Sequence, residues 1–382
     1  MSKTSPNKDI VFINQSVGYL MIDIIHAFSK DYERIILITG EVIQRNRPLP
    51  PNVVIRKVAK YKRSSTIMRF WSWTQSFLKS CWYLLHYSRK APVFAVSNPP
   101  FNVFLSLIFR NKFTYLIYDI YPEAFVEFNY LKKDSFLVRI WQWMNKRSFE
   151  RATGIFTLTQ GMKEVLEKYT EDDKIKVVPI WTDNDFLKPV EKNANPFIEQ
   201  HDWHNKFIVL YSGNLGKSHP IDDLMKAAQL TTVESILFVI IGDGERKEYL
   251  EDLILSHSLT NCQLLPWQAV DVLPYSLGSA DIAIVVQGKD ASKLAIPSKT
   301  YNYLSVGAPI IGIASEDSEL CKLIEENNVG YCFTGGDASG LSNFILSLYQ
   351  DPELRMEISA RCLELSKLYS PSNANNFVKY AI

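Results

Sequence analysis

Residues 206–220 read KFIVLYSGNLGKSHP, an apolar run that ends in a loop with two glycines. A helical pattern of apolar residues begins directly after this loop, at about Ile221. A buried strand that leads through a glycine loop into a helix is typical of parallel α/β sheets, which place ligands at the ends of their strands. The N–H groups of such a loop can bind a phosphate, to which Lys217 would add a positive charge. A plain tight turn is the alternative explanation of the same glycines.

The alternation of apolar runs and helical patterns continues on both sides of this stretch. Short apolar runs bounded by Gly, Asn, Pro or Asp predict strands, and longer amphipathic segments predict helices. In the first half, strands are expected at residues 9–14, 34–40, 53–58, 92–97, 113–119 and 154–159. In the second half, further strands are expected at residues 235–244, 262–267, 280–286, 309–314 and 329–333, with helices at about 221–229, 247–256, 270–277 and 298–306.

The 382 residues exceed what one hydrophobic core usually holds, which indicates two domains. A polar, turn-rich stretch at about 179–196 separates the two series of strands. We therefore expect an α/β protein with one Rossmann-like domain over residues 1–188 and another over residues 189–365. A C-terminal segment, residues 366–382, could pack back on the first domain.

The net charge of +1 conceals two halves of opposite sign. Residues 1–180 contain 27 Lys and Arg against 15 Asp and Glu, and the remaining residues contain 15 against 26. Opposite charges on two domains indicate different partners.

Much of the positive charge lies in two segments that are also rich in aromatic residues. Between Arg56 and Lys90 there are nine basic residues and no acidic one, and a second such segment covers Lys132 to Arg151. This composition favours docking on an anionic membrane surface, while the aromatic side chains could instead pack on the sheet. No recognisable nucleic-acid-binding motif is present, so no nucleic-acid partner is expected.

The cysteines, the N-terminus and an uncharged stretch indicate in which cellular compartment the protein is expected. The five cysteines have no CxxC motif or short metal-ligand spacing, which predicts buried free thiols in a reducing compartment, without disulfides or zinc. The polar start MSKTSPNKDI is unlike a signal peptide. Residues 91–109 are uncharged, but Pro99 and Pro100 interrupt them and favour a strand and a turn over a spanning helix. A cytoplasmic protein at the inner face of the membrane is expected.

Residues 287–309 read QGKDASKLAIPSKTYNYLSVGAP and form the richest polar loop of the chain. Ser298 stands where a helix N-cap is expected, and Lys299 then falls in the first helical turn. A cation at this position opposes the helix dipole, so it favours a bound anion such as a diphosphate, although a solvated lysine explains it too. Asn302 follows Ser298 by four residues and shares its face of the helix.

These loops follow one another in an order that resembles the donor-binding lobe of GT-B glycosyltransferases, over about residues 207–333. The resemblance is to glycosyltransferase family 4, in particular its bacterial surface-polysaccharide branch, and it is carried by SGNLGKSHP, FVIIGDGERKEYL, LPWQAVDVLPYSLGSADIAIV and PSKTYNYLSVGAPIIG. It implies a GT-B fold, with two Rossmann-like domains facing a central cleft. It also implies metal-independent transfer of a sugar from a nucleotide-sugar, with retention of configuration. The opposite charges of the two halves and the basic, aromatic segments add the expectation that the acceptor is a lipid-linked saccharide. The donor is expected to be a UDP-sugar, and no cofactor or metal is expected.

The resemblance also assigns roles to single residues. In the first half, residues 14–18 and 118–123 resemble the acceptor-side loops of the family. The implied catalytic residues are Asp119, Glu123 and Lys299. The implied acceptor-side residues are Gln15, Ser16, Gly18 and Asn98. The implied donor-binding residues are Gly213, Asn214, Lys217, Gly242, Trp267, Lys293, Ser298, Lys299 and Asn302, of which Trp267 could instead fill the core.

The chain departs from the family pattern at three positions. Leu294 and Asn302 stand where the family often has two glutamates, and Tyr118 stands where many members have a histidine. A UDP-sugar epimerase of the same fold, or a glycosyltransferase-like adaptor without activity, therefore remains as an alternative.

Overall fold

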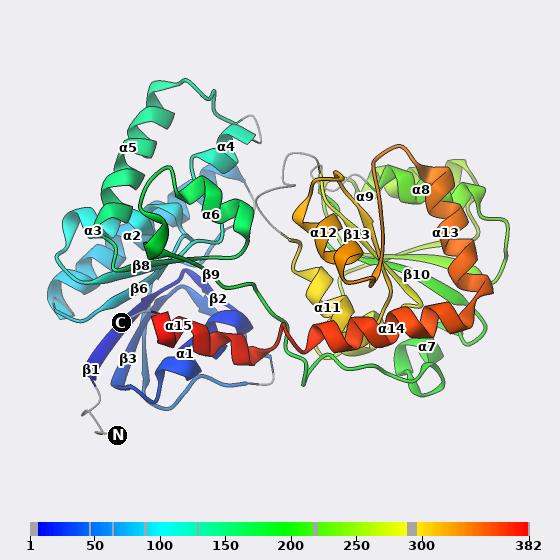
Figure 1. The fold of residues 1–382 in the computed structure, drawn as a ribbon, viewed down its shortest axis with the longest axis horizontal. Helices are drawn as coiled ribbons and strands as arrows, with labels where there is room; N and C mark the ends of the chain where they lie inside the picture. Colours follow the sequence, from blue (N-terminus) through cyan, green and yellow to red (C-terminus); the bar gives the residue numbers. More distant parts are fainter. Residues whose placement is uncertain are drawn as a thin grey trace. The chain divides into compact units, whose positions relative to one another are not determined.

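The computed structural model describes residues 7–45, 47–62, 65–87, 90–127, 130–216, 221–288 and 296–380. It divides into two compact units, Met1–Ile180 with Pro371–Ile382 and Trp181–Ser370 (Figure 1). The expected boundaries after residues 188 and 365 differ from this division by a few residues. The reason is that Thr182 already belongs to the second unit, where its N–H donates to the carbonyl of Tyr369 at 3.3 Å.

The first unit is built on a seven-stranded parallel sheet, with the order β5-β3-β1-β6-β7-β8-β9. Its strands are β1 (Asn7–Ile13), β3 (Tyr32–Thr39), β5 (Val53–Lys57), β6 (Val93–Val96), β7 (Phe113–Leu116), β8 (Gly154–Thr157) and β9 (Ile175–Val177). Two short strands, β2 (Ser16–Val17) and β4 (Glu41–Val42), pair separately. β6, β7 and β8 are buried throughout, as expected for strands covered on both faces.

Helices cover both faces of this sheet (Figure 1). One face carries α1 (Tyr19–Phe28), the 3₁₀ helix η5 (Pro371–Ala374) and α15 (Asn375–Tyr380), which pack together. Phe377 of α15 lies against Phe94 and Phe156, with ring centroids 6.0 and 4.6 Å away. The core of the opposite face includes side chains from α2 (Thr66–Tyr87), α3 (Leu105–Ile108), α5 (Phe136–Arg151) and α6 (Gln160–Leu166). The shorter elements are η1 (Pro100–Phe104), α4 (Glu123–Glu127) and η2 (Asp172–Lys174).

The second unit has a six-stranded parallel sheet with the order β12-β11-β10-β13-β14-β15. Its strands are β10 (Phe207–Ser212), β11 (Ile236–Ile241), β12 (Cys262–Leu265), β13 (Ile282–Val286), β14 (Ile310–Ile313) and β15 (Gly330–Phe333). Its helices are η3 (Lys192–Ala194), α7 (Pro196–His201), α8 (Asp222–Leu230), α9 (Lys247–Ser256), α10 (Leu273–Leu277), α11 (Lys299–Val306), α12 (Glu319–Glu326), α13 (Ala338–Gln350) and α14 (Pro352–Ser366). α8 packs with α13, and α11 packs with α14.

Both sheets have the strand order of doubly wound Rossmann folds. Counted along the chain within each unit, the strands run 3-2-1-4-5-6, and β9 extends the first sheet at one edge. The direction of winding reverses between β1 and β6 in the first unit and between β10 and β13 in the second. The carboxyl ends of these strands are the expected ligand sites. The predicted α/β class with two parallel sheets is confirmed.

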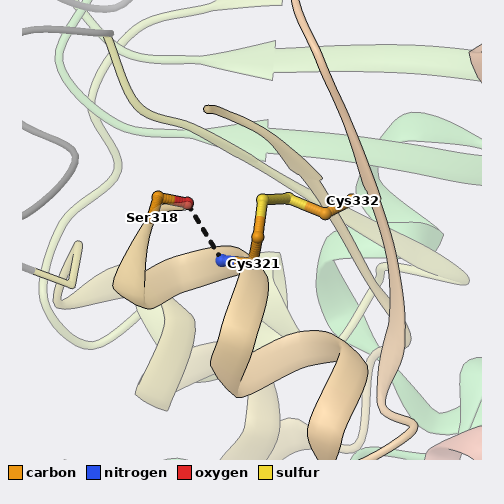
Figure 2. Close-up of a disulfide and its surroundings, with 3 residues drawn as sticks. All are labelled: Ser318, Cys321 and Cys332. Atoms are coloured by element: carbon orange, nitrogen blue, oxygen red, sulfur yellow. Dashed lines mark hydrogen bonds between the residues drawn. A yellow bond between two sulfur atoms is a disulfide. The ribbon is translucent and has the colours of Figure 1, made fainter. Parts of the chain in front are cut away.

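The structure corrects one expectation about the cysteines. Cys321 in the first turn of α12 and Cys332 on β15 form a disulfide, with Cα atoms 5.4 Å apart (Figure 2). Ser318 caps the same helix, since its hydroxyl accepts a hydrogen bond from the N–H of Cys321 at 3.1 Å. The prediction of free thiols throughout was wrong for this pair because a separation of 11 residues does not reveal that α12 leads directly to the strand beside it. Cys81, Cys262 and Cys362 are free.

Within the ranges that the structure describes, none of the helices has the length and apolar character needed to cross a membrane.

Candidate donor and acceptor sites

The loop after β10 lies where the strand order of the second sheet reverses. Gly213 directly follows β10 and donates its N–H to the carbonyl of Ile241, at the end of β11, at 2.9 Å. Asn214 is exposed, and its carbonyl accepts a hydrogen bond from the hydroxyl of Tyr211 at 2.8 Å. Two predicted donor-binding residues, Gly213 and Asn214, therefore stand at the carboxyl end of a central strand, which is where sheets of this kind bind ligands.

Gly242, a third predicted donor-binding residue, follows β11 and has a structural reason to be glycine. A Cβ atom at this position would collide with the carbonyl oxygen of Gly213. The two loops are also joined by backbone hydrogen bonds of 2.9 Å, from Leu215 to Asp243 and from Arg246 to Leu215. Gly242 thus allows the loops after β10 and β11 to pack together, which fixes the backbone around Gly213.

Lys299 brings a cation to the same place. Its Nζ atom is buried and has no hydrogen-bond partner among the described residues. The atom lies 4.1 Å from the centre of the Tyr211 ring, and a Cβ atom at Gly213 would collide with it. Burial lowers the pKa of Lys299 to about 7. Because a cation–π contact replaces only part of the lost hydration, this amine is placed to receive an anion.

Ser298 does not act as the predicted N-cap. Its backbone is already in the right-handed helical region, its side chain accepts no capping hydrogen bond, and the residue is exposed. Instead, the N–H of Thr300 donates to the carbonyl of Pro297 at 3.0 Å, so a tight turn at the proline starts the helix. Ser298 thus stands at the predicted N-cap position of α11, but its side chain does not cap the helix.

Asn302 and Trp267 have different surroundings from those of Lys299. The Oδ1 atom of Asn302 accepts a hydrogen bond from the hydroxyl of Thr182 at 2.7 Å, which holds the amide within the second unit. Trp267 follows β12 and is 54% exposed, so the alternative that it fills the core was wrong. A ribose contact by Asn302 and a base contact by Trp267 stay predictions.

Three residues of the predicted donor region, Lys217, Lys293 and Leu294, lie outside the described residues.

In the first unit, the loops after β1 and β6 meet where the strand order reverses. The N–H of Gln15 donates to the carbonyl of Asn98 at 3.2 Å, which joins two predicted acceptor-side residues. The side chain of Gln15 is buried, and its Nε2 atom donates to the carbonyls of Ala59 and Ser72 at 3.0 Å each. This bonding indicates that Gln15 anchors α2, while Asn98 is only half-buried.

Ser16 and Gly18 lie on the chain that leads from β1 into α1. The hydroxyl of Ser16 donates to Glu41 Oε1 at 3.0 Å, across the short pair of β2 and β4. Gly18 directly precedes α1, and a Cβ atom built on it would have no atom within 4 Å. The packing of the chain therefore leaves open space beside Gly18.

Asp119 follows β7 and is held through its backbone. The hydroxyl of Ser97 accepts hydrogen bonds from the N–H groups of Tyr118 at 3.0 Å and Asp119 at 3.3 Å. The carboxylate reaches solvent, and no ion pair to it is found in the described part of the chain. The protein atoms around it nevertheless raise its pKa by partial desolvation. Asp119 is thus an accessible carboxylate beside the β6 loop.

Glu123, the other predicted catalytic carboxylate, is engaged inside its own unit. Its Oε1 atom accepts hydrogen bonds from the hydroxyl of Tyr169 and from Gln142 Nε2, the latter at 3.2 Å. This bonding ties the first turn of α4 to α5 and to the end of α6. It favours a positioning role for Glu123 over contact with an acceptor.

Sequence reasoning missed Tyr211 and Thr182, which contact the predicted residues Lys299 and Asn302. Tyr211 stands two residues before Gly213, but an aromatic residue in a buried strand is typical of core packing. Only the folded structure, which places Lys299 over its ring, shows the difference. In the described ranges, no three His, Cys, Asp or Glu side chains are grouped so that they could hold a metal ion.

Residues 194–362, all within the second unit, match the model of the family Glycosyl transferases group 1. This part of the chain is a group 1 glycosyltransferase domain. The resemblance to glycosyltransferases inferred from the order of the loops is thereby confirmed.

Two curated relatives agree with this assignment. WbjE of Pseudomonas aeruginosa, a probable glycosyltransferase, is 26% identical over 61% of this chain and 59% of its own length. WcaI of Escherichia coli K12, whose name assigns it to colanic acid biosynthesis as a glycosyl transferase, is 32% identical over 47% of this chain and 46% of its own length. The chain thus spans about half the length of the curated relatives that it matches.

The fold is also similar to that of a solved crystal structure. The crystal structure of HepE from Anabaena in complex with UDP and glucose has a TM-score of 0.71, with 16% identity over 98% of both chains. This likeness concerns the fold alone, and it confirms the predicted GT-B class.

Proposed function

We propose that the protein is a retaining, metal-independent glycosyltransferase, which moves a sugar from a UDP-sugar to a lipid-linked saccharide in surface polysaccharide biosynthesis. The main support for a nucleotide-sugar donor is the amine of Lys299, which is buried beside Gly213 and has no hydrogen-bond partner among the described residues. The presence of UDP and glucose in HepE supports the nature of the donor, and the name of WcaI supports the polysaccharide pathway.

The main task of the donor-binding residues is to stabilise the charge of the leaving nucleoside diphosphate. The bond between the anomeric carbon and the diphosphate oxygen breaks, while that carbon forms a bond to an acceptor hydroxyl. Negative charge then develops on the leaving nucleoside diphosphate. Lys299 and the N-terminus of α11 would stabilise this charge, which is the work that a metal ion performs elsewhere.

On the acceptor side, Asp119 is the carboxylate that can reach a substrate. It is exposed at the carboxyl end of β7 and could take the proton of the acceptor hydroxyl. The open space beside Gly18 leaves room for an acceptor sugar, whereas Glu123 holds α4 in place.

The acceptor would be reached from a membrane surface on which the first unit docks. Trp71 on α2 and Trp143 on α5 are 58% and 60% exposed, so these aromatic side chains do not all pack on the sheet. The two helices lie within the basic segments 56–90 and 132–151. Exposed tryptophans beside basic residues suit the interface of an anionic membrane, and the proposed location is its inner face.

The donor site is tested by the variant Lys299→Met, with Lys226→Met as control. Lys226 lies on α8 in the same unit and is exposed, and its Nζ atom lies 3.8 Å from Asp223 Oδ1. The hydrogen bonds of a buried cation to a diphosphate contribute about 2 kcal/mol, so Lys299→Met should weaken UDP binding roughly thirtyfold. Lys226→Met should bind UDP as the wild type does. Calorimetric titration with UDP measures both.

Turnover separates the proposed enzyme from the alternatives. Incubation with UDP-sugars in the absence of acceptor should release UDP slowly, and Lys299→Met should abolish that release. Binding of UDP-sugars without turnover under any acceptor would indicate an adaptor, and conversion to an epimeric UDP-sugar would indicate an epimerase. If neither UDP nor any UDP-sugar binds, the donor site is wrongly assigned.

A further inference from the structure

An apolar groove of about 940 Å³ lies in the first unit, between α2 and α5. Its walls come from these two helices, from η1 and α3, from Phe125 of α4, and from Tyr130 and Leu131. Nearly all of its lining is hydrocarbon or aromatic, represented by Phe77, Phe101, Leu137 and Met144. Its volume is at the upper end of the range for small-molecule sites.

Aromatic rings form the inner wall of this groove. Trp73 and Trp141 belong to this wall, and Tyr121, which is not part of the lining, packs against both, with ring centroids 6.2 and 6.3 Å away. The indole nitrogens of Trp73 and Trp141 are buried and have no hydrogen-bond partner in the part of the chain that the structure describes. These two indoles therefore offer a ligand in the groove aromatic surface rather than hydrogen bonds.

Arg69 brings one positive charge to the groove. It is part of the lining, its Nε atom is buried without a hydrogen-bond partner, and it makes no ion pair within the described ranges. Arg69 stands one helical turn before Trp73 on α2, and both line the groove. Trp73 packs against Tyr121, which follows Asp119 by two residues, with ring centroids 6.2 Å apart. The charged part of the groove thus lies beside the chain segment that carries the proposed acceptor carboxylate.

The groove opens to solvent among exposed apolar side chains of its own walls. Leu78, Ile108 and Leu137 line the groove and are each more than half exposed. Ile67 on α2 and Phe136 on α5 are further exposed apolar side chains of the same two helices. The groove is therefore continuous with the surface that would meet the membrane.

We propose that this groove binds the hydrocarbon chain of the lipid-linked acceptor, with Arg69 facing the acceptor phosphate. The proposal rests on the proposed function and adds where the lipid is held. A peptide would bring backbone amides, which this lining cannot satisfy, whereas an alkyl or prenyl chain has no hydrogen bonds to lose. Arg69, which makes no ion pair within the described ranges, matches one phosphate at the head of such a chain.

A series of octyl, decyl and dodecyl phosphates, used as monomers below their micelle concentrations, tests the groove without any membrane. Trp73 and Trp141 report binding through their fluorescence, and calorimetry measures the affinity. Each methylene buried in the groove should tighten binding about fourfold. An affinity that does not change with chain length, or that equals that of inorganic phosphate, overturns the proposal.

Two matched substitutions on α2 locate the binding. Thr74 lines the groove, whereas its neighbour Gln75 is exposed and lies outside it. Thr74→Trp should fill the groove and weaken dodecyl phosphate at least about tenfold, while Gln75→Trp and the isosteric Thr74→Val should stay within about twofold of the wild type. Equal effects of both tryptophans would place the probe on the outer surface and overturn the proposal.

Arg69→Gln examines the charged end. It should weaken dodecyl phosphate but leave dodecanol unchanged, because only the phosphate needs the cation. The same preparations are titrated with UDP, so that the two proposals can fail separately. UDP binding with a flat chain-length series overturns the groove alone, and chain-length dependence without UDP binding overturns the donor site alone.

Discussion

The amine of Lys299 lies against the face of Tyr211, and no carboxylate is paired with it in the described part of the chain. Burial lowers its pKa to about 7, so at neutral pH the residue is divided between its charged and neutral forms. An anion bound beside it stabilises the charged form and raises its pKa again. Protonation of Lys299 and binding of an anion are therefore coupled.

This coupling predicts the pH dependence of UDP affinity. Below about pH 7, Lys299 is protonated in the free and the bound protein, and its contribution is constant. Above that pH, the free protein loses the proton that the complex needs, so the affinity should fall by up to about tenfold per pH unit. Calorimetry from about pH 7 to about pH 9 measures this fall. Lys299→Met should remove it, and an unchanged profile in that variant would refute the coupling.

A second prediction at the residue scale concerns Gly242. Gly242→Ala would force its Cβ against the carbonyl oxygen of Gly213, which should destabilise the second unit by about 1–3 kcal/mol and weaken UDP binding. Gly335→Ala is the control, because its Cβ would meet only Asp223 Oδ2, at 3.7 Å. Urea unfolding measures the free energy of unfolding of both variants. Equal values would show that the loops after β10 and β11 have room for a Cβ atom at residue 242.

For single residues, the sequence predicted where a site residue lies in the fold better than it predicted what its side chain contacts. Gly213 and Lys299 were predicted to act together, and the structure brings them together because one follows a strand and the other starts a helix of the same sheet. Gln15 and Glu123 were predicted from motif positions at strand ends, but their side chains are bonded within the first unit. Strand ends follow from apolar patterns, whereas the direction of a side chain depends on partners far along the chain.

At the scale of elements, α2 and α5 differ from ordinary helices that cover a sheet. Each buries one side and leaves large aromatic residues exposed, for example Trp71 and Trp143. The aromatic side chains within residues 56–90 were expected either to meet a membrane or to pack on the sheet. The structure buries Trp73 and leaves Trp71 exposed, so packing explains only some of them, and contact with a membrane stays a prediction. The alternation of strands and helices was predictable from periodicity, whereas β9, with only three residues, was too short to stand out.

The exposed tryptophans predict how the protein binds vesicles. The double variant Trp71→Ser/Trp143→Ser should reduce sedimentation with anionic vesicles several-fold without loss of stability, because both side chains are already exposed. Trp267→Ser removes an equally exposed tryptophan from the second unit and should bind vesicles as the wild type does. Equal binding of the wild type to neutral and anionic vesicles would contradict the role of the basic residues.

At the scale of the whole molecule, the two units share one architecture but not one composition. The basic excess lies in residues 1–180, which all belong to the first unit, and the acidic excess lies in the rest of the chain, most of which forms the second unit. Length, charge and the turn-rich stretch were sufficient to predict two domains. The disulfide between Cys321 and Cys332 was not predictable, because its spacing has no motif and only the packing of α12 beside β15 brings the thiols together.

The C-terminal helix provides a test of this division. Phe377 is 1% exposed and packs in the first unit, so Phe377→Ala should destabilise that unit by about 3 kcal/mol. Tyr380→Ala on the same helix should have little effect, since Tyr380 is exposed. Scanning calorimetry should show two unfolding transitions. Phe377→Ala should lower the midpoint of the transition that does not respond to UDP and leave the UDP-stabilised transition unchanged. If the UDP-sensitive transition moves instead, the assignment of α15 to the first unit is wrong.

The return of the chain to the first unit has a consequence for how the protein is made. Domains usually fold during translation from the N-terminus onward. Here the aromatic side chains of Phe94 and Phe156 receive Phe377 only after all of Trp181–Ser370 has left the ribosome. The unit that begins first is thus completed last, and the part of its sheet face that Phe377 covers has no cover from α15 while the second unit is being synthesised.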